Sequence, residues 1–108
     1  MVLDYEAMVQ ERYTGIVYEV LISIYEDDES YFEEGTIEQE FFDDENEAKD
    51  FYVSQIQRED LYDFFNDYAD VPEYDTVGVF LLERTMNAGF FADTYFTDDI
   101  IDMCTIAR

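Results

Sequence analysis

The chain has 108 residues, the size of one domain, and 48% of them are hydrophobic, including ten Tyr and ten Phe. That is too much apolar and aromatic content for a disordered acidic tail, so we expect a folded domain. Five basic residues oppose 29 acidic ones, and the formal net charge of −24 makes direct binding to nucleic acid or to an anionic membrane unfavourable.

The first clear element is a strand over residues 14–25. Its even-numbered residues form a largely apolar face, as expected for a strand that packs on a core. The opposite face alternates Glu19 and Ser23 with Val17, Leu21 and Tyr25, so it is also partly apolar. This pattern is typical of a central strand. Residues 1–12 fit either a short helix or an edge strand.

A second, shorter strand is expected at residues 36–42, after an acidic loop that ends at Gly35. Alternation places Ile37, Gln39 and Phe41 on one face of it. The two strands should pair as an antiparallel hairpin with a long, charged connection.

Residues 43–57 predict a helix. Asp44 can cap its N-terminus, and Glu47 follows three residues later, as in a capping box. The acids in its first turn favour the positive end of the helix dipole. Its stripe of buried positions, with one polar interruption, would consist of Ala48, Phe51, Tyr52, Gln55 and Ile56.

A helical pattern continues or restarts over residues 58–72, with a break near Arg58, and Pro72 ends it. The apolar positions recur at three- and four-residue spacing, whereas acids cover the other side. These apolar positions are Leu61, Phe64, Phe65 and Tyr68.

A second hairpin is expected near the C-terminus. A strand over 76–86 would reach a turn at Asn87-Ala88-Gly89 and return over 90–96. Asp98-Asp99 would interrupt it, and residues 100–108 fit a strand or a short helix. The order β-β-α-α-β-β predicts a single α+β domain over 1–108, with a mostly antiparallel sheet of about four strands and one or two helices on one face.

The residue types do not favour catalysis. The chain has no histidine, the commonest general base near neutral pH. Cys104 is the single cysteine, so no disulfide forms within the chain and no thiol nucleophile has a histidine partner. No glycine-rich phosphate loop occurs. We expect neither an enzyme nor a cofactor.

Two other properties follow from the pattern of residues. The acidic segments lack the glycine and the spacing of a calcium-binding loop, so no dedicated metal site is predicted. The N-terminal sequence MVLDYEAMVQER has no basic segment and no long apolar run, and no membrane-spanning segment is recognised elsewhere. We expect a cytoplasmic protein, either monomeric or dimeric.

The net charge matches that of a short piece of DNA. Duplex DNA carries one charge per about 1.7 Å, so 24 charges correspond to roughly 41 Å, or about twelve base pairs. A compact chain of this length is expected to measure very roughly 35–45 Å in its longest dimension. The protein would therefore carry about the charge of a DNA segment of its own length.

In size, charge and lack of catalytic residues, the whole chain resembles the DNA-mimic inhibitors, many of them phage-encoded: anti-restriction proteins, anti-CRISPR proteins and inhibitors of uracil-DNA glycosylase. The resemblance implies inhibition of a basic nucleic-acid-binding protein, such as a host defence nuclease, a CRISPR effector or a repair enzyme. It rests on no residue motif, so it implies neither a fold nor individual functional residues.

The acidic runs are the expected partner-binding surface, because carboxylates on a rigid surface can occupy the positions of phosphates. Aromatic rings in the acidic loop, including Tyr31, either anchor the partner or hold the loop on the core. The candidate binding residues are Glu26, Asp27, Asp28, Glu29, Tyr31, Glu33, Glu34, Asp43, Asp44, Glu45, Asp60, Asp63 and Asp67.

Two alternatives to mimicry stay open. The chain could be an acidic adaptor or regulatory domain that binds another basic protein surface. It could also be a structural or salt-adapted domain whose charge serves only solubility, although salt adaptation concerns the surface and does not account for so many large aromatic residues.

Overall fold

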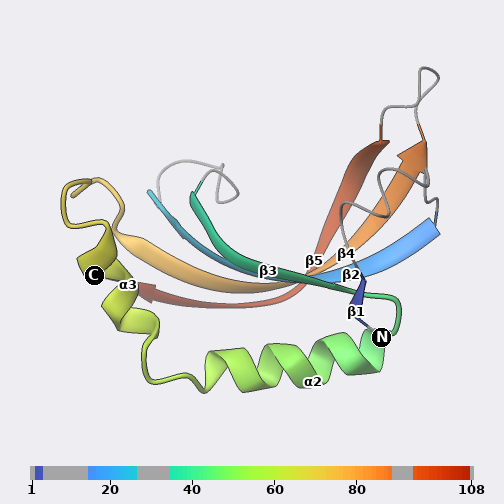
Figure 1. Ribbon diagram of the computed structural model, residues 1–108, viewed down its shortest axis with the longest axis horizontal. Coiled ribbons are helices and arrows are strands. Elements are labelled where there is room, and N and C mark those ends of the chain that lie inside the picture. The colour runs from blue at the N-terminus through green and yellow to red at the C-terminus, as the bar shows by residue number, and fades with distance from the viewer. Residues whose placement is uncertain (1, 4–14, 27–34, 89–93, 108) are drawn as a thin grey trace.

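The protein is a five-stranded antiparallel sheet with its helical segments on one face (Figure 1). The computed structural model describes residues 2–3, 15–26, 35–88 and 94–107. The strand order is β1-β3-β2-β4-β5. The elements are β1 (Val2–Leu3), β2 (Gly15–Tyr25), β3 (Thr36–Phe42), α2 (Glu45–Ile56), the 3₁₀ turn η2 (Leu61–Asp63), α3 (Phe64–Asp67), β4 (Thr76–Ala88) and β5 (Thr94–Ala107).

The predicted α+β class and the order β-β-α-α-β-β are confirmed, and β1 adds a short fifth strand. β2 is the central strand, as its sequence indicates. It pairs along its whole length with β4, from Gly15 opposite Met86 to Tyr25 opposite Thr76. On its other side it forms the predicted hairpin with β3.

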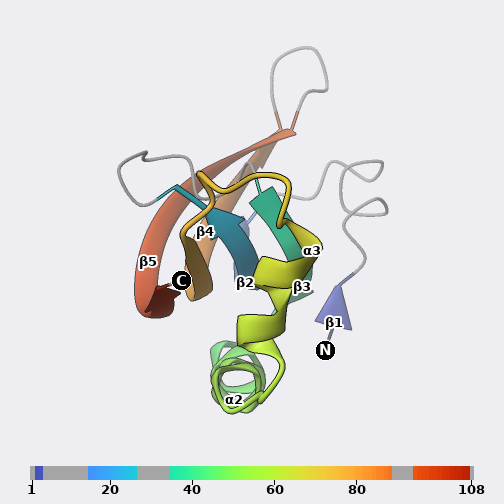
Figure 2. The same cartoon turned by 90° about the vertical axis from the view of Figure 1, so that its left-hand side faces the viewer.

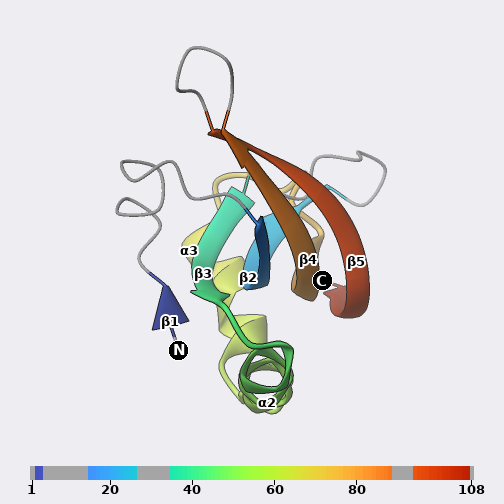
Figure 3. The same cartoon turned by 90° about the vertical axis from the view of Figure 1, so that its right-hand side faces the viewer.

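The main core lies between the sheet and the helical segments. Val20, Ile22 and Ile24 of β2 project into it together with Val77, Val79 and Leu81 of β4. Ala48 and Tyr52 of α2 pack against them, as the predicted stripe requires. Figures 2 and 3, which look along α2 from its two ends, show the sheet curving above this helix.

The prediction for the faces of β3 is wrong at one residue. The pairing shifts between Ile22 and Ser23, whose partners are Glu38 and Thr36, so Ile37 is an extra residue in β3. A bulge of one residue turns the side chains beyond it to the opposite face. Ile37 therefore packs against the core beneath the helices, whereas Phe41 does not belong to that cluster.

The second predicted helix is shorter than expected. Instead of a helix over 58–72, the chain forms the single turn η2 and then the single turn α3. Asp and Asn hold four positions between residues 60 and 67, and their side chains compete with the helix for backbone hydrogen bonds. The apolar spacing was still informative, because Leu61 and Phe65 are buried in the core and Phe64 and Tyr68 pack against it.

The C-terminal hairpin is longer than predicted. Asn87 and Ala88 belong to β4, where they pair with Tyr95 and Thr94, so the expected turn at 87–89 is wrong. Asp98-Asp99 does not interrupt β5, which is a strand throughout. The irregularity lies instead at Ile101, between the partners of Leu81 and Leu82. Charged side chains are common on edge strands, where they discourage pairing with another chain.

The face of the sheet away from α2 is also buried at its centre. Leu21, Tyr25, Phe80 and Leu82 form a second apolar cluster there. Gly78 leaves room for it, since a Cβ at this position would lie 2.5 Å from the ring of Phe80. The half-apolar pattern of β2 on this face therefore indicates a second small core.

Candidate interaction surface

Most of the predicted binding loop, six of its seven candidate residues, lies outside the described residues. Asp27, Asp28, Glu29, Tyr31, Glu33 and Glu34 belong to this part. Glu26 follows the last residue of β2 and is partly exposed. The other described candidates form two groups, one at each end of α2.

The first group lies at the N-terminus of α2. The carboxylate of Asp44 accepts a hydrogen bond of 2.8 Å from the backbone N–H of Asn46, so the predicted cap is confirmed. Glu45 lies 3.4 Å from the ammonium of Lys49, one turn along the helix. Asp43 and Asp44 are exposed, whereas Glu45 is partly buried.

The second group lies beyond the C-terminus of α2. Asp60 accepts two hydrogen bonds from Arg58, at 2.9 Å from Nε and 2.8 Å from the Nη2 nitrogen. These bonds hold the pKa of Asp60 below its usual value. Asp63 and Asp67, in the turns that follow, are exposed.

The structure separates the two groups instead of gathering them into one cluster. A helix of 12 residues is about 18 Å long, and α2 lies between them (Figure 1). Exposed acids that were not among the candidates extend both groups. Glu47 and Asp50 continue the three-residue spacing that starts at Asp44, and this spacing could have identified them.

We call the resulting surface the acidic band. Its members are exposed carboxylates that follow α2, the two short turns and the segment leading to β4. They are Asp43, Asp44, Glu47, Asp50, Glu59, Asp60, Asp63, Asp67, Asp70, Glu73 and Asp75.

Within the described residues, carboxylates of the same chain engage each of the three cations. Lys49 pairs with Glu45, and Arg58 pairs with both Glu38 and Asp60. Arg84 of β4 pairs with Glu19 of β2 at 3.0 Å, and the two side chains are only 7% and 2% exposed. These three positive charges therefore form ion pairs within the chain.

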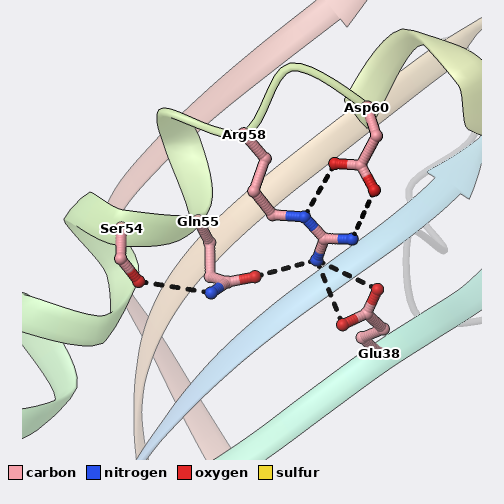
Figure 4. A network of polar contacts seen from close by, with 5 residues as sticks. All are labelled: Glu38, Ser54, Gln55, Arg58 and Asp60. Carbon is pink, nitrogen blue, oxygen red and sulfur yellow. Dashed lines mark hydrogen bonds and ion pairs between the residues drawn. The ribbon is translucent and has the colours of Figure 1, made fainter.

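Arg58 joins three elements (Figure 4). One terminal nitrogen, Nη1, lies 3.0 and 3.1 Å from the two carboxylate oxygens of Glu38 on β3. The same nitrogen donates a 2.9 Å hydrogen bond to the side-chain oxygen of Gln55 in α2. The guanidinium carbon also lies 5.5 Å from the centre of the Phe64 ring. Arg58 therefore fixes the end of α2 against β3 and the following turn.

A pocket of about 210 Å³ lies beside this network, between β3 and α2. Val20 and Ile22 of β2 line it, together with the β3 segment 38–40, Phe51 and Gln55. It therefore combines apolar walls with two carboxylates.

Two exposed apolar features complete the surface. Tyr62 is 54% exposed within the acidic band, and its ring meets Phe65 edge-on with 5.2 Å between the ring centres. On β5, the opposite side of the molecule from β3, Ile100, Ile101 and Met103 are exposed. Both features offer apolar contact to a partner.

Within the ranges that the structure describes, no group of three or more Cys, Asp or Glu side chains is placed to hold a metal ion. Within the same ranges, no helix is long and apolar enough to cross a membrane.

Comparison with known protein families, curated proteins and solved structures found no match for this chain.

Proposed function

We propose that the protein is a nucleic-acid mimic that binds and inhibits a DNA- or RNA-binding protein through the acidic band. One observation carries the proposal. The band exposes its carboxylates to solvent, and of the three described cations only Arg58 pairs with a member of it, Asp60, whereas Lys49 and Arg84 pair with carboxylates outside the band. The field of this surface is consequently negative and largely uncompensated.

The dimensions support the proposal. The longest extent of the protein is 40 Å, within the range expected from chain length. Its net charge of −24 is that of about 41 Å of duplex DNA. A channel that holds a short duplex would therefore meet a similar charge over a similar length.

In this function, the carboxylates of the band occupy phosphate positions in the partner's channel. Arg and Lys side chains that normally hold phosphate would bind them, with arginine able to form paired hydrogen bonds. The negative field accelerates the encounter, and the exposed ring of Tyr62 supplies short-range apolar contact. A phage-encoded protein acting in the cytoplasm on a defence nuclease, a CRISPR effector or a repair enzyme fits this function.

The test is competition with nucleic acid. Partners captured from a bacterial lysate at low salt and released at high salt would be purified and loaded with a labelled duplex or single-stranded RNA. We expect the protein to displace the label. Asp63→Asn with Asp67→Asn should slow association, because both residues lie in the band. The control variant, Asp99→Asn with Asp102→Asn, removes the same amount of charge from β5, outside the band. It should slow association less than the Asp63 and Asp67 variant does.

An acidic adaptor is the second candidate, and the exposed residues of β5 favour it. Ile100, Ile101 and Met103 are exposed apolar residues on an edge strand, where a basic protein can contact them without a nucleic-acid channel. If the partner binds this protein and its nucleic acid together without mutual loss of affinity, mimicry is wrong and the adaptor function replaces it.

A further inference from the structure

The pocket between β3 and α2 has an apolar floor and an acidic rim. Val20 and Ile22, which are buried, form the floor. Phe51 of α2 lines one wall. Glu38 and Glu40 lie two residues apart on β3, so they share one face of the strand and stand on the same side of the pocket.

One end of this rim already holds a guanidinium group. Arg58 of the same chain binds Glu38 and Gln55 there (Figure 4). Glu40 is partly exposed and lies two residues farther along β3. Lys49, Arg58 and Arg84 all pair with carboxylates other than Glu40, so none of these three cations neutralises it.

The volume and the charge limit what can enter. Pockets for drug-sized ligands usually measure about 300–1,000 Å³, so a pocket of about 210 Å³ suits a single side chain better. Two carboxylates repel anions, and a wholly apolar ligand would leave them without compensation. A cation on an aliphatic stem satisfies both parts of the pocket, because the stem covers apolar surface while the charged end reaches the rim.

We propose that this pocket binds an arginine side chain of the partner, with its methylene groups against Val20, Ile22 and Phe51 and its guanidinium on Glu40. Arginine is favoured over lysine because its guanidinium is less strongly hydrated, pairs with a carboxylate through two bonds and stacks on aromatic rings. Arg58 shows the same combination, since it binds carboxylates and lies over Phe64. The source of the arginine rests on the proposed function, but its binding can be measured without the partner.

The experiment is an NMR titration of the ¹⁵N-labelled protein at constant ionic strength. The probe is N-acetyl-arginine methylamide, and the lysine and norleucine analogues are the controls for head group and charge. We expect saturable shifts at Val20, Ile22, Glu40 and Phe51, weaker binding of the lysine analogue and no saturable binding of the norleucine analogue. Glu40→Gln should weaken arginine binding about tenfold, the effect of losing one charge-assisted interaction.

Asp50→Asn is the matched control, because it removes the same charge from an exposed position on α2 that does not line the pocket. It should change arginine affinity less than about twofold, a small electrostatic effect. Shifts that spread over the acidic band without saturation, equal binding of the norleucine analogue, or unchanged affinity in a folded Glu40→Gln variant would each overturn the proposal. If that variant does not fold, the three titrations of the natural protein decide the question.

The pocket and the proposed function can fail separately. Saturable arginine binding without any competition between this protein and nucleic acid for a partner would retain the pocket and reject mimicry. Competition that Glu40→Gln leaves unchanged, together with no saturable arginine binding, would retain mimicry and reject the pocket.

Discussion

At the residue scale, Arg58 and Lys49 show how differently two cations act in an acidic chain. Arg58 is partly buried and binds two carboxylates and an amide, and the hydrogen bonds that it donates to Asp60 and then to Glu38 raise its pKa. Lys49 forms one ion pair between side chains that are about half exposed. The geometry and burial of each cation, more than its charge, therefore decide how much it contributes to the stability of the fold.

Replacing either cation by methionine tests this difference. Arg58→Met should lower the free energy of unfolding by about 1–3 kcal/mol, because it removes charge-assisted hydrogen bonds that join three elements. Lys49→Met should lower it by about 0.5 kcal/mol or less, the usual value of an exposed pair one helical turn apart. Urea unfolding of both variants gives the comparison. Equal losses would show that net charge, not the Arg58 contacts, sets the effect.

Tyr52 predicts a pH dependence. Its burial raises the pKa of its hydroxyl to about 12, and the nearby charges of Asp102 and Cys104 act in the same direction. An unfolded tyrosine has a pKa of about 10, so the folded state holds this proton more tightly. The resulting stability is complete below about pH 10 and is lost as the pH rises to about 12.

Tyr52→Phe should remove this loss. Between about pH 10 and 12, the free energy of unfolding of the natural protein should fall by about 2 kcal/mol more than that of the variant. Urea unfolding at several alkaline pH values measures the difference. Tyr62→Phe, at an exposed ring, controls for the loss of one tyrosine. Parallel curves for the natural protein and Tyr52→Phe would contradict the prediction.

At the scale of elements, α2 depends on its first turn. Asp44 satisfies one backbone N–H that no residue within the helix can reach. Asp44→Ala should therefore cost about 0.5–2 kcal/mol, measured as a lower urea midpoint. Asp44→Asn removes the charge but keeps a capping oxygen, so it should be close to neutral. A similar loss in both variants would assign the effect to charge instead of the cap.

β2 and β4 are joined by the buried pair of Glu19 and Arg84 as well as by backbone hydrogen bonds. Arg84→Met leaves a buried carboxylate without its cation and should destabilise the fold by about 3–5 kcal/mol. Adding Glu19→Met should recover much of this loss, because two apolar side chains replace the pair. A double variant that loses as much as the sum of the single variants would show that the two charges are not coupled.

At the scale of the whole molecule, a net charge of −24 is held within a body of 40 × 29 × 20 Å. Repulsion among the exposed acids opposes the folded state, and the three described cations relieve it only locally. The two apolar cores on either side of the sheet offset this repulsion.

The melting temperature should therefore rise with added NaCl. Salt shortens the screening distance from about 10 Å at 0.1 M to about 3 Å at 1 M, which weakens repulsion between exposed carboxylates. Thermal unfolding followed by circular dichroism from low salt to 0.5 M NaCl measures the trend. A flat or falling curve would show that bound cations or paired contacts already neutralise the acids.

Local patterns in the sequence determined β2, β3, α2 and the cap at Asp44, because alternation, helical spacing and capping depend on residues close in the chain. They also determined that the acids at 43–45 and at 60, 63 and 67 belong to two charged segments. Tertiary pairing decided the rest. Hydrogen bonds to β4 keep Asp98-Asp99 within β5, and a bulge turns Ile37 toward the core.

The contact between Arg58 and Glu38, the Glu19–Arg84 pair and the pocket at Glu40 also depended on tertiary structure. Each joins residues about 20 or more positions apart, or from different strands, and only the register of the sheet and the position of α2 bring them together. The sequence by itself determined how much negative charge the protein carries. The packing of α2 against β3 decided that one of these carboxylates, Glu40, borders an apolar pocket. The pocket exists only where side chains from separate elements meet to enclose it.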